Sequence, residues 1–271
     1  MIGQTAFTEN INSLVTANKY PRFSIIVGQE GSGKKRMAKY ISSKLGCVYA
    51  DYGIGVDDIR QMIADAYRVS MPMVYILPDA DKMSPAAKNA LLKVTEEPPQ
   101  NAYFILTLTD LNNTLGTIRS RGTVFYMDPY SVFDMERYCL TTHTVSAEEK
   151  QIICDLCETP GEVDKIVDMD TIKFYTYVEK VVDNIAVVSG SNSFKIANSI
   201  RFKDTDDKKY DLRLFWKAFM HICTTRLRDD PLKYAMGIKI TSKYLQELRV
   251  TGINKQSTFD CWLLDIRKEW M

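Results

Sequence analysis

The chain of 271 residues carries 35 basic and 34 acidic side chains, and its formal net charge of +1 argues against a protein that binds nucleic acid through a strong overall positive field. Hydrophobic residues make up 45% and charged residues 25%, the composition of an ordinary globular protein of one to three domains. No apolar run approaches the roughly 18 residues of a membrane span, and the first residues lack a signal-peptide pattern, so we expect a cytoplasmic protein without a membrane partner.

Residues 23–127 alternate short apolar runs with helical patterns, which predicts an α/β domain with a parallel sheet. The expected strands are 23–27, 47–50, 73–77, 103–108 and 124–127. The expected helices are about 34–45, 57–67 and 84–97. Gly46 is in the usual place after a helix end, and Ser84 followed by Pro85 has the pattern of a helix start.

After Asp128-Pro129 the pattern is helical throughout. Ser131 and Ser146 are expected to cap helices, and Ser146 with Glu149 forms a capping box. The expected helices lie within 131–169 and at about 171–188, 212–222, 239–249 and 256–268. Segments 189–193 and 203–209 are expected to be loops, the second because its charges leave no apolar side.

The six cysteines are too sparse for a disulfide framework in a chain of this length. Cys154 and Cys157 have the spacing of metal ligands, but a zinc site would need a second pair or nearby histidines, and the chain has only His143 and His221. The pair also fits one face of an amphipathic helix. We therefore predict a structural role for these two cysteines.

The strongest local motif is Gly28-Gln29-Glu30-Gly31-Ser32-Gly33-Lys34, which has the pattern G-x-x-x-x-G-K between an expected strand and an expected helix. Such a loop can cradle phosphate with backbone N–H groups while the lysine adds its charge. The alternative is a glycine-rich turn that only joins strand to helix. Lys35 stands where Ser or Thr would bind magnesium, so it adds positive charge and removes a metal ligand.

A second candidate site follows the strand at 73–77, in the run Pro78-Asp79-Ala80-Asp81. An active ATPase needs an Asp here for magnesium and usually a following Glu to orient water. In direct register these positions hold Pro78 and Asp79, and a shift by one places Asp79 and Ala80 there. One carboxylate is missing in either register. The alternative role for Asp79 and Asp81 is to cap a turn.

Three segments make the chain resemble the clamp-loader AAA+ subunits of bacterial DNA polymerase III: 78–84, 89–99 (Asn-Ala-Leu-Leu-Lys to Glu-Glu-Pro-Pro) and 117–121. The first of them resembles the delta-prime subunit rather than the gamma/tau motor. Further matches lie at 2–4, 56–60 and 252–256, so the resemblance extends over essentially the whole chain. It implies an AAA+ P-loop domain at 1–129 with a five-stranded parallel sheet, a small helical lid at 130–170 and an all-helical collar at 171–271.

The resemblance also implies roles for single residues. Ser120 and Arg121 match the Ser-Arg-Cys motif whose arginine enters the ATP site of the neighbouring subunit as an arginine finger, and Gly122 replaces the cysteine. A guanidinium there would spread positive charge over the γ-phosphate oxygens. Thr109 matches the sensor-1 position by its distance from Arg121, and Arg119 is either an auxiliary basic contact or a solvated side chain.

Two departures from the family pattern bear on activity. The turn at 159–163 should precede a sensor-2 arginine, but Asp164 follows, and a carboxylate would repel phosphate. The family's four-cysteine zinc module is absent, because 46–55 is a short segment with one cysteine, so we predict no structural zinc.

We therefore expect a clamp-loader subunit like delta-prime, a stator that supplies Arg121 to a motor subunit and does not hydrolyse ATP on its own. It would require no cofactor, although Lys34 and Lys35 leave room for residual ATP, ADP or phosphate. The implied partners are gamma/tau-like and delta-like subunits, the sliding clamp, and primer-template DNA through the assembled complex. The alternatives are a gamma/tau-like ATP-hydrolysing motor using Asp79 and Asp81 with magnesium, and a freestanding DNA-binding module, which the near-neutral charge disfavours.

Overall fold

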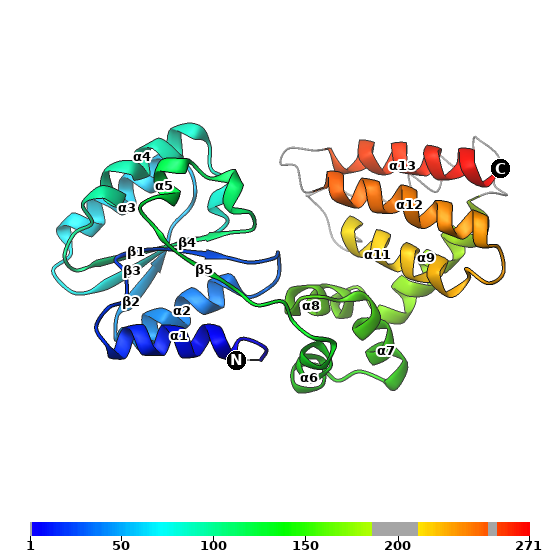
Figure 1. The fold of residues 1–271 in the computed structure, drawn as a ribbon, viewed down its shortest axis with the longest axis horizontal. Coiled ribbons are helices and arrows are strands. Elements are labelled where there is room, and N and C mark those ends of the chain that lie inside the picture. Colours follow the sequence, from blue (N-terminus) through cyan, green and yellow to red (C-terminus); the bar gives the residue numbers. More distant parts are fainter. Residues whose placement is uncertain (1, 186–210, 249–253) are drawn as a thin grey trace. The chain divides into compact units, whose positions relative to one another are not determined.

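The computed structural model describes residues 2–185, 211–248 and 254–271, and the chain divides into two compact units, Met1–Ser131 and Val132–Met271 (Figure 1). The loops expected at 189–193 and 203–209 lie outside the described residues, as do residues 252 and 253 of the matching segment 252–256.

The N-terminal unit is built on a five-stranded sheet whose paired neighbours all run parallel, in the order β2-β3-β4-β1-β5. The strands are β1 Phe23–Val27, β2 Val48–Asp51, β3 Met73–Leu77, β4 Ala102–Leu108 and β5 Thr123–Tyr126. The predicted parallel five-stranded sheet is thus confirmed. Because β1 pairs with both β4 and β5, the glycine loop that follows it emerges from the interior of the sheet.

Helices cover both faces of this sheet (Figure 1). Alternate side chains of β1 face opposite cores: Ile26 packs with the helices on one face and Ile25 with those on the other. The first face carries α1 Thr5–Thr16 and α2 Lys34–Lys44. The second face carries α3 Val56–Arg68, α4 Pro85–Glu96 and α5 Gly116–Arg119. Two 3₁₀ turns follow β3 and β4, η1 Ala80–Lys82 and η2 Leu111–Asn113.

The ends of these helices follow local chemistry. Gly46 has a positive φ of 66° after α2, as its position predicts. The Ser84 hydroxyl accepts the Ala87 N–H at 3.2 Å and caps α4. At α3 the N-cap is Gly55, whose N–H donates to the Asp58 carboxylate at 3.1 Å. The sequence pattern did not reveal α1 or α5.

The C-terminal unit is helical in all of its described secondary structure. Its helices are α6 Val132–Thr142, α7 Ala147–Leu156, α8 Pro160–Asp168, α9 Thr171–Asn184, α11 Leu212–Thr225, α12 Pro231–Glu247 and α13 Lys255–Trp270. α12 begins well before the predicted 239, because Asp230 caps it and Pro231 fits its first turn. Trp216 and Trp262 are fully buried in its core, and the Trp262 indole N–H donates to the Thr241 hydroxyl at 2.9 Å.

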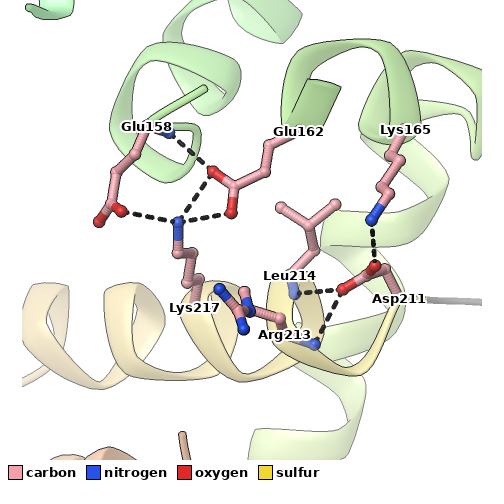
Figure 2. A network of polar contacts seen from close by, with 7 residues as sticks. All are labelled: Glu158, Glu162, Lys165, Asp211, Arg213, Leu214 and Lys217. Atoms are coloured by element: carbon pink, nitrogen blue, oxygen red, sulfur yellow. Dashed lines mark hydrogen bonds and ion pairs between the residues drawn. The ribbon is translucent and has the colours of Figure 1, made fainter. Parts of the chain in front are cut away.

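Charged side chains join α8 to α11 (Figure 2). The Lys217 ammonium lies 2.8 Å from one Glu162 carboxylate oxygen and 2.9 Å from the other, and 3.3 Å from Glu158. The Lys165 ammonium lies 2.8 Å from the Asp211 carboxylate, which also caps α11. These contacts cross from the helices assigned to the lid to those assigned to the collar. A division between lid and collar at 170/171 stays a prediction. No helix in the described ranges combines the length and apolar character needed to cross a membrane.

Candidate functional site

The loop after β1 has the backbone that a phosphate-binding loop needs. Gly31 and Gly33 have positive φ angles of 77° and 87°, a region in which a Cβ is strained. Gly33 is also the N-cap residue of α2, so the first N–H groups of that helix, which have no partner inside the helix, follow the loop directly. A Cβ on Gly28 would lie 2.9 Å from the Ser32 hydroxyl, so the loop closes tightly on itself. These backbone angles and the start of α2 are compatible with a phosphate-binding loop, and phosphate binding there stays a prediction.

Lys34 is folded into its own loop. Its ammonium donates to the carbonyl oxygens of Gly28 and Gln29, both at 2.8 Å, and the residue is only 6% exposed. Burial lowers the pKa of Lys34, while the carboxylates of Asp79 and Asp81 act in the opposite direction. A phosphate bound here would have to replace the two carbonyl groups as partner of the ammonium.

Lys35 does not join the loop. Its ammonium lies 3.0 Å from the carboxylate of Asp51 at the end of β2, and Lys39 lies 3.9 Å from the same carboxylate. The second positive charge expected at the phosphate is therefore directed toward the edge strand of the sheet.

The segment after β5 covers the loop, a contact that the sequence did not indicate. The Tyr130 hydroxyl donates to the Ser32 carbonyl oxygen at 2.6 Å and lies 4.0 Å from where a Cβ on Gly33 would be. The buried Gln4 side chain holds the same segment, because its amide nitrogen donates to the Asp128 carbonyl at 2.8 Å and its amide oxygen accepts the Asp128 N–H at 3.1 Å. Gln4 had appeared only as part of a matching segment, and Tyr130 carried no signal.

The acidic turn after β3 is tied to the end of β4. Asp79 adopts a left-handed conformation with φ 50°, its N–H donates to the Thr107 hydroxyl at 3.1 Å, and its carboxylate lies 3.1 Å from Lys82. Asp81 is buried, and one of its carboxylate oxygens accepts the Thr109 N–H at 3.3 Å. Its other oxygen, Oδ1, has no hydrogen-bond partner among the described residues. Thr107, which the sequence did not single out, thus makes the hydroxyl contact with this turn, and Thr109 contributes its backbone.

These residues fit a phosphate group better than a magnesium–nucleotide complex. The backbone N–H groups at the glycine loop and the Lys34 ammonium bring hydrogen-bond donors and one positive charge together. The position after Lys34 holds a paired lysine, and Pro78 and Ala80 offer no metal ligand. Within the described ranges, no group of three or more His, Cys, Asp or Glu side chains is arranged to hold a metal ion. The donor set for magnesium is therefore incomplete.

Arg121 lies after α5 with its guanidinium held by two groups. Nη1 donates to the Thr117 carbonyl oxygen and Nη2 to a Glu96 carboxylate oxygen, each at 2.8 Å. The Ser120 hydroxyl donates to the same Thr117 carbonyl at 3.0 Å. Behind the arginine, a Cβ on Gly122 would lie 2.7 Å from Cδ1 of Ile25, so this backbone packs directly on β1. The arginine is exposed on a backbone that the core fixes.

Arg121 and the glycine loop lie at opposite ends of the parallel strands. Thr123, two residues after Arg121, pairs with Ser24 near the start of β1, whereas Gly28 follows the end of that strand. A strand advances about 3.3 Å per residue, so roughly 13 Å along β1 separates the position of Ser24 from that of Gly28. Arg121 therefore lies far from the glycine loop of its own chain.

Asp164 is engaged within the C-terminal unit. The turn expected at 159–163 is the N-cap and first turn of α8, with Pro160 at the helix start. The Asp164 carboxylate accepts the Tyr138 hydroxyl at 3.0 Å and contacts Nε2 of His143 at 2.9 Å. It is a link between helices of this unit.

Residues 48–131 match the family model described as DNA polymerase III, delta subunit. Over 77 residues the chain is 40% identical to DNA polymerase III subunit delta′ of Yersinia pestis. The aligned segment covers 27% of this chain and 23% of that protein. Over 155 residues it is 25% identical to DNA polymerase III subunit gamma/tau of Mycoplasma pneumoniae. That aligned segment covers 46% of this chain and 23% of the relative. This chain thus spans well under half of the length of either relative.

Solved structures share the fold. A DNA polymerase III gamma subunit-related protein of Thermotoga maritima superposes with a TM-score of 0.57 at 16% identity, over 97% of this chain and 99% of that one. The RuvB Holliday junction branch migration motor of the same organism gives a TM-score of 0.50 at 16% identity, over 83% and 76%. At such low identity these likenesses concern the fold alone.

Proposed function

We propose that this chain is a member of the AAA+ clamp-loader family of DNA polymerase III, and that it is a delta-prime-like stator that supplies Arg121 to the ATP site of a neighbouring motor subunit. The single observation that carries this proposal is the place of Arg121. It is exposed, and Thr117 and Glu96 orient its guanidinium. It lies at the end of the strands opposite to the glycine loop of its own chain. A guanidinium so placed is suited to act on a phosphate bound to another chain.

The glycine loop favours a subunit that does not hydrolyse ATP. Lys35 replaces the magnesium-binding hydroxyl and pairs with Asp51. The acidic turn supplies Asp79 and Asp81, but their backbone and side-chain contacts are those of a structural turn. Groups that act together in catalysis are strongly non-additive, so the loss of several lowers the rate by orders of magnitude. Phosphate, ATP or ADP could still bind at Lys34 without turnover.

The partners follow from this role and are part of the proposal. Gamma/tau-like and delta-like subunits would adjoin the chain in a ring held by its C-terminal helices. The sliding clamp and primer-template DNA would be bound by the assembled complex. This near-neutral chain would then not need to bind DNA on its own. We also propose a cytoplasmic location and no structural zinc.

An ATPase assay on the isolated chain separates a stator from a motor. With magnesium and primed DNA, the wild type and Lys34→Ala should show the same background rate, because the magnesium ligand and the catalytic carboxylate are missing. Turnover at about 1 per second or faster that disappears in Lys34→Ala would instead favour the gamma/tau-like motor.

A further inference from the structure

The segment Asn89–Pro99 is one of the most specific parts of the resemblance, yet the roles described above use Glu96 only as a contact of Arg121. Glu96 is the last residue of α4, and Pro98-Pro99 prevents the helix from continuing. α4 packs against the short helix α5, which ends two residues before Arg121. The fold therefore brings the end of one motif to the arginine of the other.

Glu96 and Thr117 fix the guanidinium from two directions. Oε1 of Glu96 accepts a hydrogen bond from Nη2, and the Thr117 carbonyl oxygen accepts one from Nη1, each at 2.8 Å. The two acceptors belong to two different helices. A planar group held at both terminal nitrogens has its orientation set. Of the five N–H donors of a guanidinium, these contacts use two within the part of the chain that the structure describes. The other donors remain for phosphate oxygens.

We propose that Glu96 is a positioning residue that orients Arg121 toward a phosphate of the adjoining subunit. This inference rests on the proposed function, because it concerns the same arginine. The pair contributes little to folding: the side chains of Glu96 and Arg121 are 53% and 34% exposed, and exposed ion pairs are worth about 1 kcal/mol at most. Its effect is on geometry, since an arginine held in place loses less conformational freedom when it engages the phosphate.

The test measures steady-state ATP hydrolysis by the complete reconstituted clamp loader, with a motor subunit, clamp and primed DNA. Glu96→Ala should lower kcat by about tenfold to a hundredfold, because small displacements of a catalytic group have effects of that size. The KM for ATP should stay unchanged, since the motor subunit binds the nucleotide. Glu96→Gln should keep most of the rate, because its amide oxygen can accept the same hydrogen bond. Glu97→Ala, at the exposed neighbouring glutamate, is the control and should match the wild type.

A double-mutant cycle distinguishes this role from a general structural one. In an Arg121→Ala background, Glu96→Ala should have no further effect, because Glu96 acts through the arginine. A wild-type rate in Glu96→Ala, an equal loss in both backgrounds, or a Gln variant as slow as the Ala variant would overturn the positioning role and leave the stator intact. A wild-type rate in Arg121→Ala alone would refute the proposed function itself.

Discussion

Lys34 and Arg121 are the two cations that the sequence motifs single out, and the chain holds them in opposite ways. Lys34 is buried and bonded to carbonyl groups of its own loop. Arg121 is exposed, and its guanidinium plane is fixed by Glu96 and Thr117. The first arrangement places the positive charge inside its own loop, whereas the second leaves it at the surface, as the proposed role of Arg121 requires. The Lys34 ammonium is thus part of the folded loop, whereas the Arg121 guanidinium is oriented at the surface.

The fixed position of Arg121 depends on Gly122. A Cβ there would lie 2.7 Å from Cδ1 of Ile25 and 2.9 Å from Cε1 of Phe23, both buried in the core. Gly122→Ala should therefore lower the free energy of unfolding by about 1–3 kcal/mol through overpacking. Denaturant titration of the full chain measures this, with Gly116→Ala as the control because a Cβ there meets nothing within 4 Å. Equal stability of the two variants would contradict the close packing.

At the scale of elements, charged side chains connect α8 with α11 (Figure 2). The side chains of Lys217 and Glu162 are each 11% exposed, so neither charge has much water as an alternative partner. Removing one would leave the other buried without its partner. Lys165 and Asp211 form a second, more exposed contact between the same helices.

Asp211 makes this junction sensitive to acid. Burial alone would raise the pKa of its carboxyl, but the Lys165 ammonium and the N–H groups of Leu214 and Arg213 outweigh burial and lower that pKa. A carboxyl whose pKa is lower in the folded than in the unfolded chain contributes stability above the unfolded value of about 4. That contribution is lost as pH falls through the folded pKa.

Asp211→Asn keeps a capping residue and removes the charge. The wild type should exceed this variant in unfolding free energy by up to about 1 kcal/mol at pH 6, and the difference should shrink below about pH 4. Denaturant titrations across this range measure it, with Asp168→Asn, at an exposed carboxylate of α8, as the control. A difference that is independent of pH would contradict the lowered pKa.

At the scale of the whole molecule, the sheet was predictable and the contacts around the site were not. Strands such as 73–77 are continuous apolar runs with clear ends, and a buried parallel sheet requires that pattern. The glycine loop, the acidic turn and Arg121 were each visible as local motifs. The Tyr130–Ser32 and Glu96–Arg121 contacts join residues 98 and 25 positions apart, so they arise only when the strands and helices pack.

The same reason explains the residues whose surroundings differ from expectation. Lys35 looked like a second phosphate contact because it follows Lys34, but helix geometry turns successive side chains apart and places it on Asp51. Thr109 matched by sequence distance, whereas the buried hydroxyl that reaches the acidic turn belongs to Thr107. Thr107 and Thr109 are two positions apart, so strand alternation does not separate them. Thr107 lies within β4 and Thr109 follows the end of the strand, and the place where the strand ends beside the turn is a tertiary property.

The most direct test of the stator is ATP hydrolysis by a clamp loader reconstituted with Arg121→Ala in this chain. The variant should assemble normally, because Arg121 is exposed and contributes little to the core. Hydrolysis at the motor site that Arg121 faces should fall by about 10³-fold or more, the usual effect of an arginine finger. Arg60→Ala, an exposed arginine of the same unit, should match the wild type. An unchanged rate at that site in the assembled Arg121→Ala complex would contradict the account.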